Sequence, residues 1–147
     1  MKIFNLLLLT TLIATLLTAF THAQQPPPKI QVCFSPHGGC TEAITFQLAK
    51  ATRTVLVQAY SFTSAPIAKA LVDAHKRGVK VTVILDKSQR TEKYSSADFL
   101  LNSGIPTFID ANHAISHNKV TIVDSHIVIT GSFNFTNAAE ESNADRR

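Results

Sequence analysis

Five residues late in the sequence have types and spacings suited to the chemistry of a phosphate ester. His117, Lys119, Asp124, Ser132 and Asn134 form the pattern H-x-K-x4-D-x6-G-S-x-N. The histidine and the lysine are two residues apart, so on a strand their side chains leave the same face and can converge on one anionic group. The serine and the asparagine repeat that spacing and would add a hydroxyl and an amide if the two segments pair. A nucleophile or base, a fixed cation and two neutral hydrogen-bonding groups together predict a phosphate-ester site.

Two strands joined by a short turn are expected to carry this pattern. Residues 117–123 are rich in β-branched side chains, and a turn-like stretch at 124–126 precedes a second strand over 127–130. Gly131 then allows the backbone to turn toward the site. By strict alternation, Asp124 points away from the face that carries the histidine and the lysine. We therefore expect Asp124 to hold the turn or a neighbouring cation.

The rest of the sequence alternates strand and helix patterns. In chain order we expect a strand over 30–35, a helix over 41–52 with Thr41 as its N-cap, a strand over 54–59, a helix over 65–77, a strand over 79–86, a helix over 96–103 and a strand over 105–109. This order predicts a single α/β domain with a mixed, mostly buried sheet flanked by helices. In such sheets the loops at the carboxyl ends of strands surround the ligand site. Lys87, Arg90 and Lys93 are therefore candidate contacts to a polyanionic substrate, although each alone is also typical of a solvated loop.

The first residues have the pattern of a targeting segment. Lys2 gives a positive start, residues 6–20 are largely apolar, and residues 21–23 form a small-x-small cleavage site. Residues 1–23 are therefore interpreted as a signal peptide, and 24–29 as an extended, proline-rich leader. The apolar run is shorter than the roughly twenty residues that span a bilayer, but a retained N-terminal anchor is an alternative. Either interpretation predicts an exported protein, periplasmic or secreted.

Charge and cysteine content indicate the kind of binding partner and the state of the two cysteines. The formal net charge of +4 suits a polyanionic partner, such as nucleic acid or an acidic membrane surface. Cys33 and Cys40 flank a stretch with proline and glycine, so in an oxidising compartment they could form a local disulfide. A pair of reduced thiols is the alternative. Metal binding is disfavoured because the sequence has no further cysteine near these two.

The late pattern resembles the HKD signature of the phospholipase D superfamily, and looks closest to its small, exported, single-motif endonucleases of the Nuc type. Other stretches also resemble that group, namely residues 34–36, 59–63, 76–79, 103–106 and 131–136. The resemblance implies a phosphodiesterase that needs neither metal nor cofactor and works through a covalent phosphohistidine. It also implies a homodimer, because such an active site needs two motifs and this chain has one.

The resemblance assigns a role to each residue of the signature, whose catalytic members are His117, Lys119 and Asp124. One His117 would attack phosphorus, while its symmetry mate would protonate the leaving oxygen and then activate water. Lys119 and Asn134 would hold the non-bridging oxygens, and Ser132 would support the phosphate or the imidazole. Of the signature residues, only Asp124 is assigned to the scaffold by strand alternation.

The sequence departs from the family pattern after residue 136. Asp145 falls where relatives usually have a glutamate that orients the histidine, so its reach is one methylene shorter. Residues 30–147 are expected to form the phosphodiesterase domain without the family's usual C-terminal strand and helix. The leading prediction is a non-specific endonuclease acting on DNA or RNA. The alternatives are a phospholipase D that hydrolyses phospholipid headgroups and a truncated, inactive relative that binds polyanions.

Overall fold

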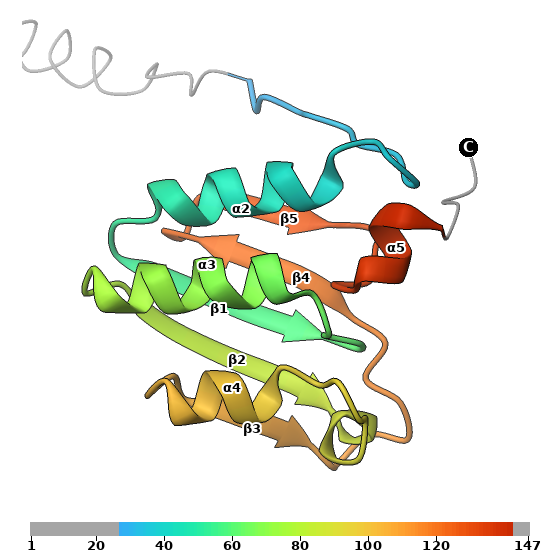
Figure 1. The fold of residues 1–147 in the computed structure, drawn as a ribbon. Coiled ribbons are helices and arrows are strands. Elements are labelled where there is room, and N and C mark those ends of the chain that lie inside the picture. The colour runs from blue at the N-terminus through green and yellow to red at the C-terminus, as the bar shows by residue number, and fades with distance from the viewer. Residues whose placement is uncertain (1–26, 143–147) are drawn as a thin grey trace, which may run out of the picture. The chain divides into compact units, whose positions relative to one another are not determined.

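A mixed sheet of five strands organises the chain. The computed structural model describes residues 27–142, and its sheet has the strand order β3-β2-β1-β4-β5 (Figure 1). The strands are β1 (Thr54–Ala59), β2 (Lys80–Asp86), β3 (Thr107–Asp110), β4 (Lys119–Val123) and β5 (Ile127–Thr130). The first three run parallel, whereas β4 is antiparallel to β1 and β5 is antiparallel to β4. The predicted fold class and the predicted β4–β5 hairpin are confirmed.

Three helices pack on one face of this sheet, as Figure 1 shows for α2, α3 and α4. The helical elements are α2 (Cys40–Lys50), α3 (Ala65–Lys76), the 3-10 helix η1 (Lys87–Arg90), α4 (Ala97–Asn102) and α5 (Asn137–Glu141). Alternate residues of the strands, such as Val55 and Val57 of β1, join Leu48, Leu71 and Leu100 of the helices in one core. Burial of these side chains is the main force that holds the helices on the sheet.

The other face of the strands is much less covered by the described residues. Leu56 and Ile122 are partners across β1 and β4, and Ile122 is in turn a partner of Val128 on β5. Leu56 and Val128 are 49% and 62% exposed, and Phe108 of β3 is 57% exposed. The strands therefore bury one face almost completely and leave large apolar side chains accessible on the other.

Two predictions about the start of the domain are wrong. Residues 30–35 form no strand, and Ile30 and Val32 are 84% and 66% exposed instead of facing the core. The alternation of apolar residues in this stretch indicated a strand, but no strand among residues 27–142 pairs with it. The predicted disulfide between Cys33 and Cys40 is not formed either. Cys40 is buried at the start of α2, whereas Cys33 lies in the extended stretch that precedes it.

The N-terminus of α2 is capped by a residue from a distant part of the chain. The sequence predicted Thr41 as the N-cap of this helix, but the N-cap is Gly39. The carboxylate of Glu140 in α5 accepts hydrogen bonds from the backbone N–H of Gly39 at 3.1 Å and of Thr41 at 2.7 Å. Burial alone would raise the pKa of Glu140, but these bonds outweigh it and lower the pKa. A long-range acceptor thus replaces the local cap.

The predicted signal segment, residues 1–23, and the candidate acid Asp145 lie outside the described residues. Within residues 27–142, no helix is long and apolar enough to cross a membrane.

Candidate active site

The predicted histidine and lysine meet at the amino end of β4. Lys119 begins this strand and is paired with Ala59 at the carboxyl end of β1, while His117 lies two residues before the strand. The ammonium nitrogen Nζ of Lys119 is 3.1 Å from both ring nitrogens of His117 and 3.1 Å from its carbonyl oxygen. His117 is exposed, whereas Lys119 is buried. The structure therefore presents the imidazole to solvent above a recessed cation.

The environment of Lys119 is electrostatically unusual. Burial lowers the pKa of its ammonium group, because the protein interior solvates a charge less well than water does. No carboxylate in residues 27–142 forms an ion pair with it. A buried cation without a protein counter-ion is stabilised when an anion binds beside it. The site therefore favours an anionic ligand.

Tyr60 completes the surroundings of the imidazole. Its ring centre is 4.4 Å from that of His117 at an interplanar angle of 55°, and 5.1 Å from Nζ of Lys119. The backbone N–H of Tyr60 also donates to the carbonyl of Asn118 at 2.8 Å. The sequence did not single out this tyrosine as a site residue. The only signal was its position in the stretch 59–63, which resembles the endonuclease group.

The segment after β5 runs past the same end of the sheet. Thr130 is paired with Val120, so residues 131–134 continue beside the start of β4. Phe135 anchors this segment, because its carbonyl accepts hydrogen bonds from Thr63 and Ser64, both at 2.9 Å. The side-chain oxygen of Asn134 is buried and has no hydrogen-bond partner among the described residues. A carbonyl oxygen only accepts hydrogen bonds, so a phosphate oxygen cannot satisfy this atom, whereas the side-chain amide nitrogen of the same residue can donate to one.

Ser132 is exposed on the same segment, two residues before Asn134. The structure thus gathers His117, Lys119 and the 131–134 segment at one end of the β4–β5 hairpin, as the spacing predicted.

Asp124 lies just past the opposite end of β4, five residues and roughly 17 Å of extended chain away from Lys119. Its carboxylate accepts the backbone N–H groups of Thr52 at 2.9 Å, Arg53 at 2.7 Å and Thr54 at 2.9 Å. The Thr54 and Thr52 bonds, with that of Arg53, hold its pKa far below the usual range despite burial. The guanidinium of Arg53 also donates to its carbonyl at 3.1 Å. These bonds tie the turn after β4 to the start of β1, and the catalytic assignment of Asp124 stays a prediction.

The candidate basic loop is tied to the site through its one buried side chain. Lys87 and Arg90 of η1 are exposed, as is Lys93 after it. Gln89 is buried between them, and its side-chain oxygen accepts the N–H of Phe62 at 3.1 Å. The cations therefore belong to a loop anchored on the segment that follows β1, next to Tyr60.

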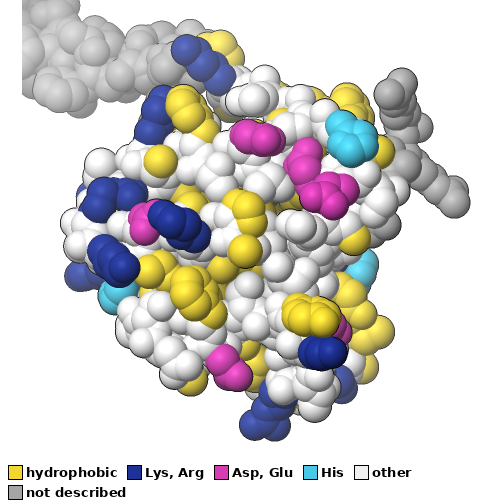
Figure 2. All heavy atoms as spheres, viewed as in Figure 1, with side chains coloured by type: hydrophobic (Ala, Val, Ile, Leu, Met, Phe, Trp, Pro, Cys, Tyr) yellow, Lys and Arg dark blue, Asp and Glu magenta, His cyan; other side chains and the backbone are white. Residues whose placement is uncertain are grey.

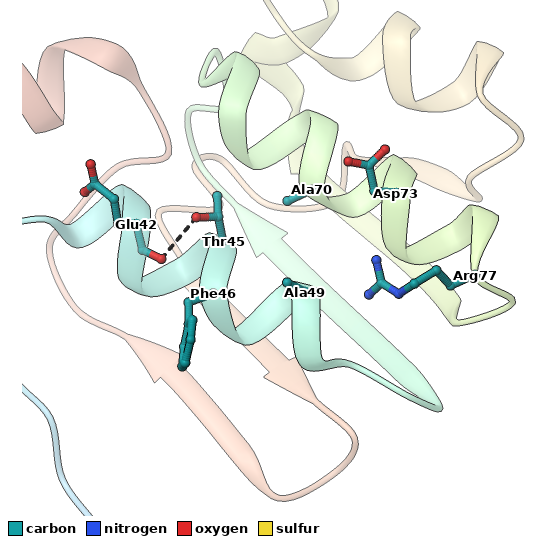
Figure 3. A pocket seen from close by; sticks show the side chains of 7 residues that line it. All are labelled: Glu42, Thr45, Phe46, Ala49, Ala70, Asp73 and Arg77. Carbon is teal, nitrogen blue, oxygen red and sulfur yellow. Dashed lines mark hydrogen bonds between the residues drawn. The ribbon is translucent and has the colours of Figure 1, made fainter.

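A surface hollow of about 440 Å³ lies elsewhere, between α2 and α3 (Figure 3). Phe46, Ala49 and Ala70 give it an apolar lining, and Glu42, Asp73 and Arg77 give it charged groups. None of the predicted site residues lines this hollow. The face shown in Figure 2 likewise mixes basic, acidic and hydrophobic side chains without one dominant charge. The candidate site residues His117 and Lys119 lie instead at the amino end of β4.

Comparisons with known proteins show the family of the chain. The family model described as "Cardiolipin synthase, PLD-like domain" matches residues 44–146. A phospholipase D from Rickettsia conorii is 45% identical over 117 residues, which are 80% of this chain and 58% of the relative. The chain thus spans less than two thirds of that relative's length.

Two solved structures share the fold. Nuc from Salmonella typhimurium, described as a phospholipase D family member, has a TM-score of 0.76 at 44% identity, over 80% of this chain and 79% of Nuc. NucT from Helicobacter pylori has a TM-score of 0.63 at 29% identity, over 71% of this chain and 72% of NucT. The resemblance inferred from the late sequence pattern is therefore confirmed, and the chain belongs to the phospholipase D superfamily.

Proposed function

We propose that this protein hydrolyses phosphodiester bonds through a covalent intermediate on His117, with nucleic acid as its substrate. The observation that carries the proposal is the contact between the His117 ring and the buried ammonium of Lys119. A nucleophile next to a desolvated cation is suited to attack an anionic phosphorus centre, because the cation offsets the charge on the phosphate oxygens.

The reaction proceeds in two balanced displacements. A ring nitrogen of His117 attacks phosphorus, the P–N bond forms, and the bond from phosphorus to the leaving oxygen breaks. The leaving oxygen takes a proton from the imidazolium of a second histidine. That histidine, now neutral, removes a proton from water, which attacks phosphorus and breaks the P–N bond. One general acid thus becomes the general base of the second step.

Lys119 and Asn134 would bind the non-bridging oxygens, on which charge accumulates in the transition state. The desolvation of Lys119 strengthens this interaction, because a charge pair attracts more strongly where water is excluded. Ser132, on the same segment, would support the phosphate or the imidazole. Asp145 as a histidine-orienting acid stays a prediction.

The second histidine is proposed to be His117 of a second copy of the chain. The described residues bring only one histidine into contact with Lys119, and this histidine is exposed at the end of the sheet. A two-fold axis close to His117 would place two such rings on opposite sides of one phosphate. The proposed active protein is therefore a homodimer that shares one site.

Nucleic acid is favoured as substrate by the likeness to Nuc and by the exposed cations of the η1 loop. Each phosphate of a nucleic acid backbone can pair with such a cation, and this gives affinity without sequence preference. Phospholipid is the second candidate. It is favoured by the name of the Rickettsia relatives and by the apolar side chains exposed on the open sheet face. The protein is proposed to act after export, in the periplasm or outside the cell.

One experiment tests the proposal against both alternatives. Purified protein is offered plasmid DNA, RNA and phosphatidylcholine vesicles in EDTA, beside His117→Ala. His126→Ala is the matched control, because this exposed histidine lies at the far end of β4 in the turn held by Asp124. We expect wild type and His126→Ala to cleave nucleic acid, and His117→Ala not to. A covalent phosphate should be trapped on His117 in the two active proteins.

Cleavage that requires added metal, or that survives His117→Ala, would refute the phosphohistidine mechanism. Hydrolysis of the vesicles alone would assign the protein to phospholipids. Binding of nucleic acid without any cleavage would identify it as a polyanion-binding relative.

A further inference from the structure

A buried carboxylate outside the signature is hydrogen-bonded to the residue that precedes the proposed nucleophile, His117. Asp86, the last residue of β2, is only 3% exposed. One of its oxygens accepts the backbone N–H of Ser116 at 2.7 Å, and the other accepts that of Ser88 at 2.9 Å. Ser116 is the residue immediately before His117. Asp86 therefore joins the end of β2 to the chain segment that carries the proposed nucleophile.

Contacts on both sides of His117 fix its backbone. The side-chain amide of Gln58 donates to the hydroxyl of Ser116 at 3.2 Å, so side chains from both β1 and β2 hold that residue. On the other side of His117, the carbonyl of Asn118 accepts the N–H of Tyr60 at 2.8 Å. His117 is thus an exposed residue between two fixed neighbours. Residues 115–118 have no regular secondary structure, so these bonds are the contacts that hold the segment in place.

The shortest of these bonds is also charge-assisted. Burial would raise the pKa of Asp86, but the hydrogen bonds from Ser116 and Ser88 outweigh it and lower the pKa. An ionised carboxylate in a buried position is costly unless its oxygens are satisfied, and hydrogen bonds to it are stronger than those between neutral groups. One oxygen of Asp86 would suffice to cap η1, because it accepts the N–H of Ser88. The second oxygen accepts the N–H of Ser116, in the segment that carries His117.

We infer that Asp86 is a positioning residue for His117: by fixing Ser116, its carboxylate holds the backbone from which the imidazole is presented to Tyr60, Lys119 and the phosphate. In-line attack tolerates little displacement, since a misplacement of about 1 Å can cost on the order of 100-fold in rate. Asp86 does not touch the substrate in this arrangement. Its loss should therefore slow chemistry while leaving binding of the phosphodiester nearly unchanged.

The test compares Asp86→Asn with Glu140→Gln. Both changes replace a carboxylate that accepts two backbone N–H groups by its neutral amide, but Glu140 caps α2 and contacts no neighbour of His117. Hydrolysis of bis(p-nitrophenyl) phosphate is measured in EDTA, with each rate corrected for the folded fraction. The ring signals of His117 are followed by NMR in the protein without substrate, and so is the exchange of the Ser116 amide.

For Asp86→Asn we expect kcat to fall by about 10- to 100-fold, with KM within about 2-fold of wild type. The ring signals of His117 should shift or broaden in this variant alone. In wild type the Ser116 amide should exchange more slowly than that of exposed Ile115. A purely structural role would lower the stability of both variants and leave kcat and the His117 signals of the folded protein unchanged, and that result would overturn the inference.

The rate measurement rests on the proposed function, whereas the NMR measurements do not. If wild type fails to hydrolyse the diester, the proposed function fails, and the His117 signals still decide whether Asp86 positions the ring. If Asp86→Asn does not fold, the wild-type amide decides: protection of Ser116 supports the inference, and exchange at the rate of a free loop overturns it.

Discussion

At the scale of single residues, the proposed catalytic role of Lys119 is expected to lower the stability of the folded protein. Lys119 is buried, and its ammonium lies against His117 and the Tyr60 ring without a carboxylate partner among residues 27–142, in a place where an apolar side chain would be more stable. The expected benefit is a desolvated cation next to His117. Stability and activity should therefore respond to its replacement in opposite directions.

We expect Lys119→Met to lower kcat by about 100- to 1000-fold, as does the loss of one transition-state donor in other enzymes. The free energy of unfolding should stay the same or rise by about 1 kcal/mol, because methionine needs no solvation of a charge. Diester hydrolysis and denaturant unfolding measure the two effects. Lys119→Arg, which keeps the charge, is the control for activity. A methionine variant with wild-type kcat would contradict the proposed role.

Asp124 is expected to make stability depend on pH in the acid range. Because its pKa in the folded protein is held low by the N–H groups of Thr54, Thr52 and Arg53, folding favours the ionised form. This stabilisation is fully present above the unfolded pKa of about 3.9 and is lost as the pH falls through the folded pKa.

Melting temperatures measured from pH 7 down to pH 2 test this expectation. Asp124→Asn should melt lower than wild type at pH 7, by a shift on the order of 5 °C, and the difference should shrink as the pH falls. Asp73→Asn is the control, because Asp73 is exposed and pairs only with Lys69 on the surface of α3. A constant difference between Asp124→Asn and wild type at all pH values would contradict the account.

At the scale of elements, the contact between Phe62 and Phe135 connects the end of β1 to the segment that carries Ser132 and Asn134. Their ring centres are 5.8 Å apart in an edge-to-face arrangement, and both side chains are almost completely buried. Their backbones also form an isolated parallel bridge. The position of Asn134 therefore depends on the packing of its neighbour.

Phe135→Ala should lower the free energy of unfolding by about 3–5 kcal/mol, the usual cost of removing a buried phenylalanine side chain. It should also raise KM for a diester, because Asn134 loses its anchored neighbour. Phe46→Ala is the matched control, since Phe46 is 55% exposed on α2, and it should change either quantity little. Denaturant unfolding and steady-state kinetics measure both effects, and equal losses in the two variants would refute the prediction.

The elements themselves were predictable wherever local pattern and tertiary burial agree. The apolar runs of β1 and β2 and the helical pattern of α3 fall within one or two residues of their expected bounds. The stretch 30–35 shows the opposite case, because its alternating apolar residues have no strand to pair with. The cap of α2 could not be predicted either, since its acceptor, Glu140, comes from 101 residues later in the chain than Gly39.

At the scale of the whole molecule, the proposed shared site predicts that inactive chains suppress active ones. Wild-type protein is mixed with a nine-fold excess of His117→Ala under conditions in which subunits exchange. Random pairing leaves about one tenth of the wild-type chains with a wild-type partner, and activity per wild-type chain should fall to about one tenth. A site contained in one chain would lose nothing on mixing. Sedimentation that shows only monomer in an active sample would contradict the dimer as well.

The sequence by itself determined the family and the mixed α/β fold, and it identified His117 and Lys119 as the candidate site residues. These depend on residue types and on spacings within one short segment, although the strand predicted over 117–123 begins only at Lys119 and leaves His117 outside it. Strand alternation also removed Asp124 from the expected phosphate site.

Only the tertiary structure decided what surrounds the histidine. Tyr60 follows β1 and Asp86 ends β2, and no local spacing relates either residue to His117. The same holds for the burial that lowers the pKa of Lys119, because burial depends on how α2, α3 and β1 close over the strand. Contacts between segments far apart in sequence are set by packing, and packing is a property of the whole folded chain.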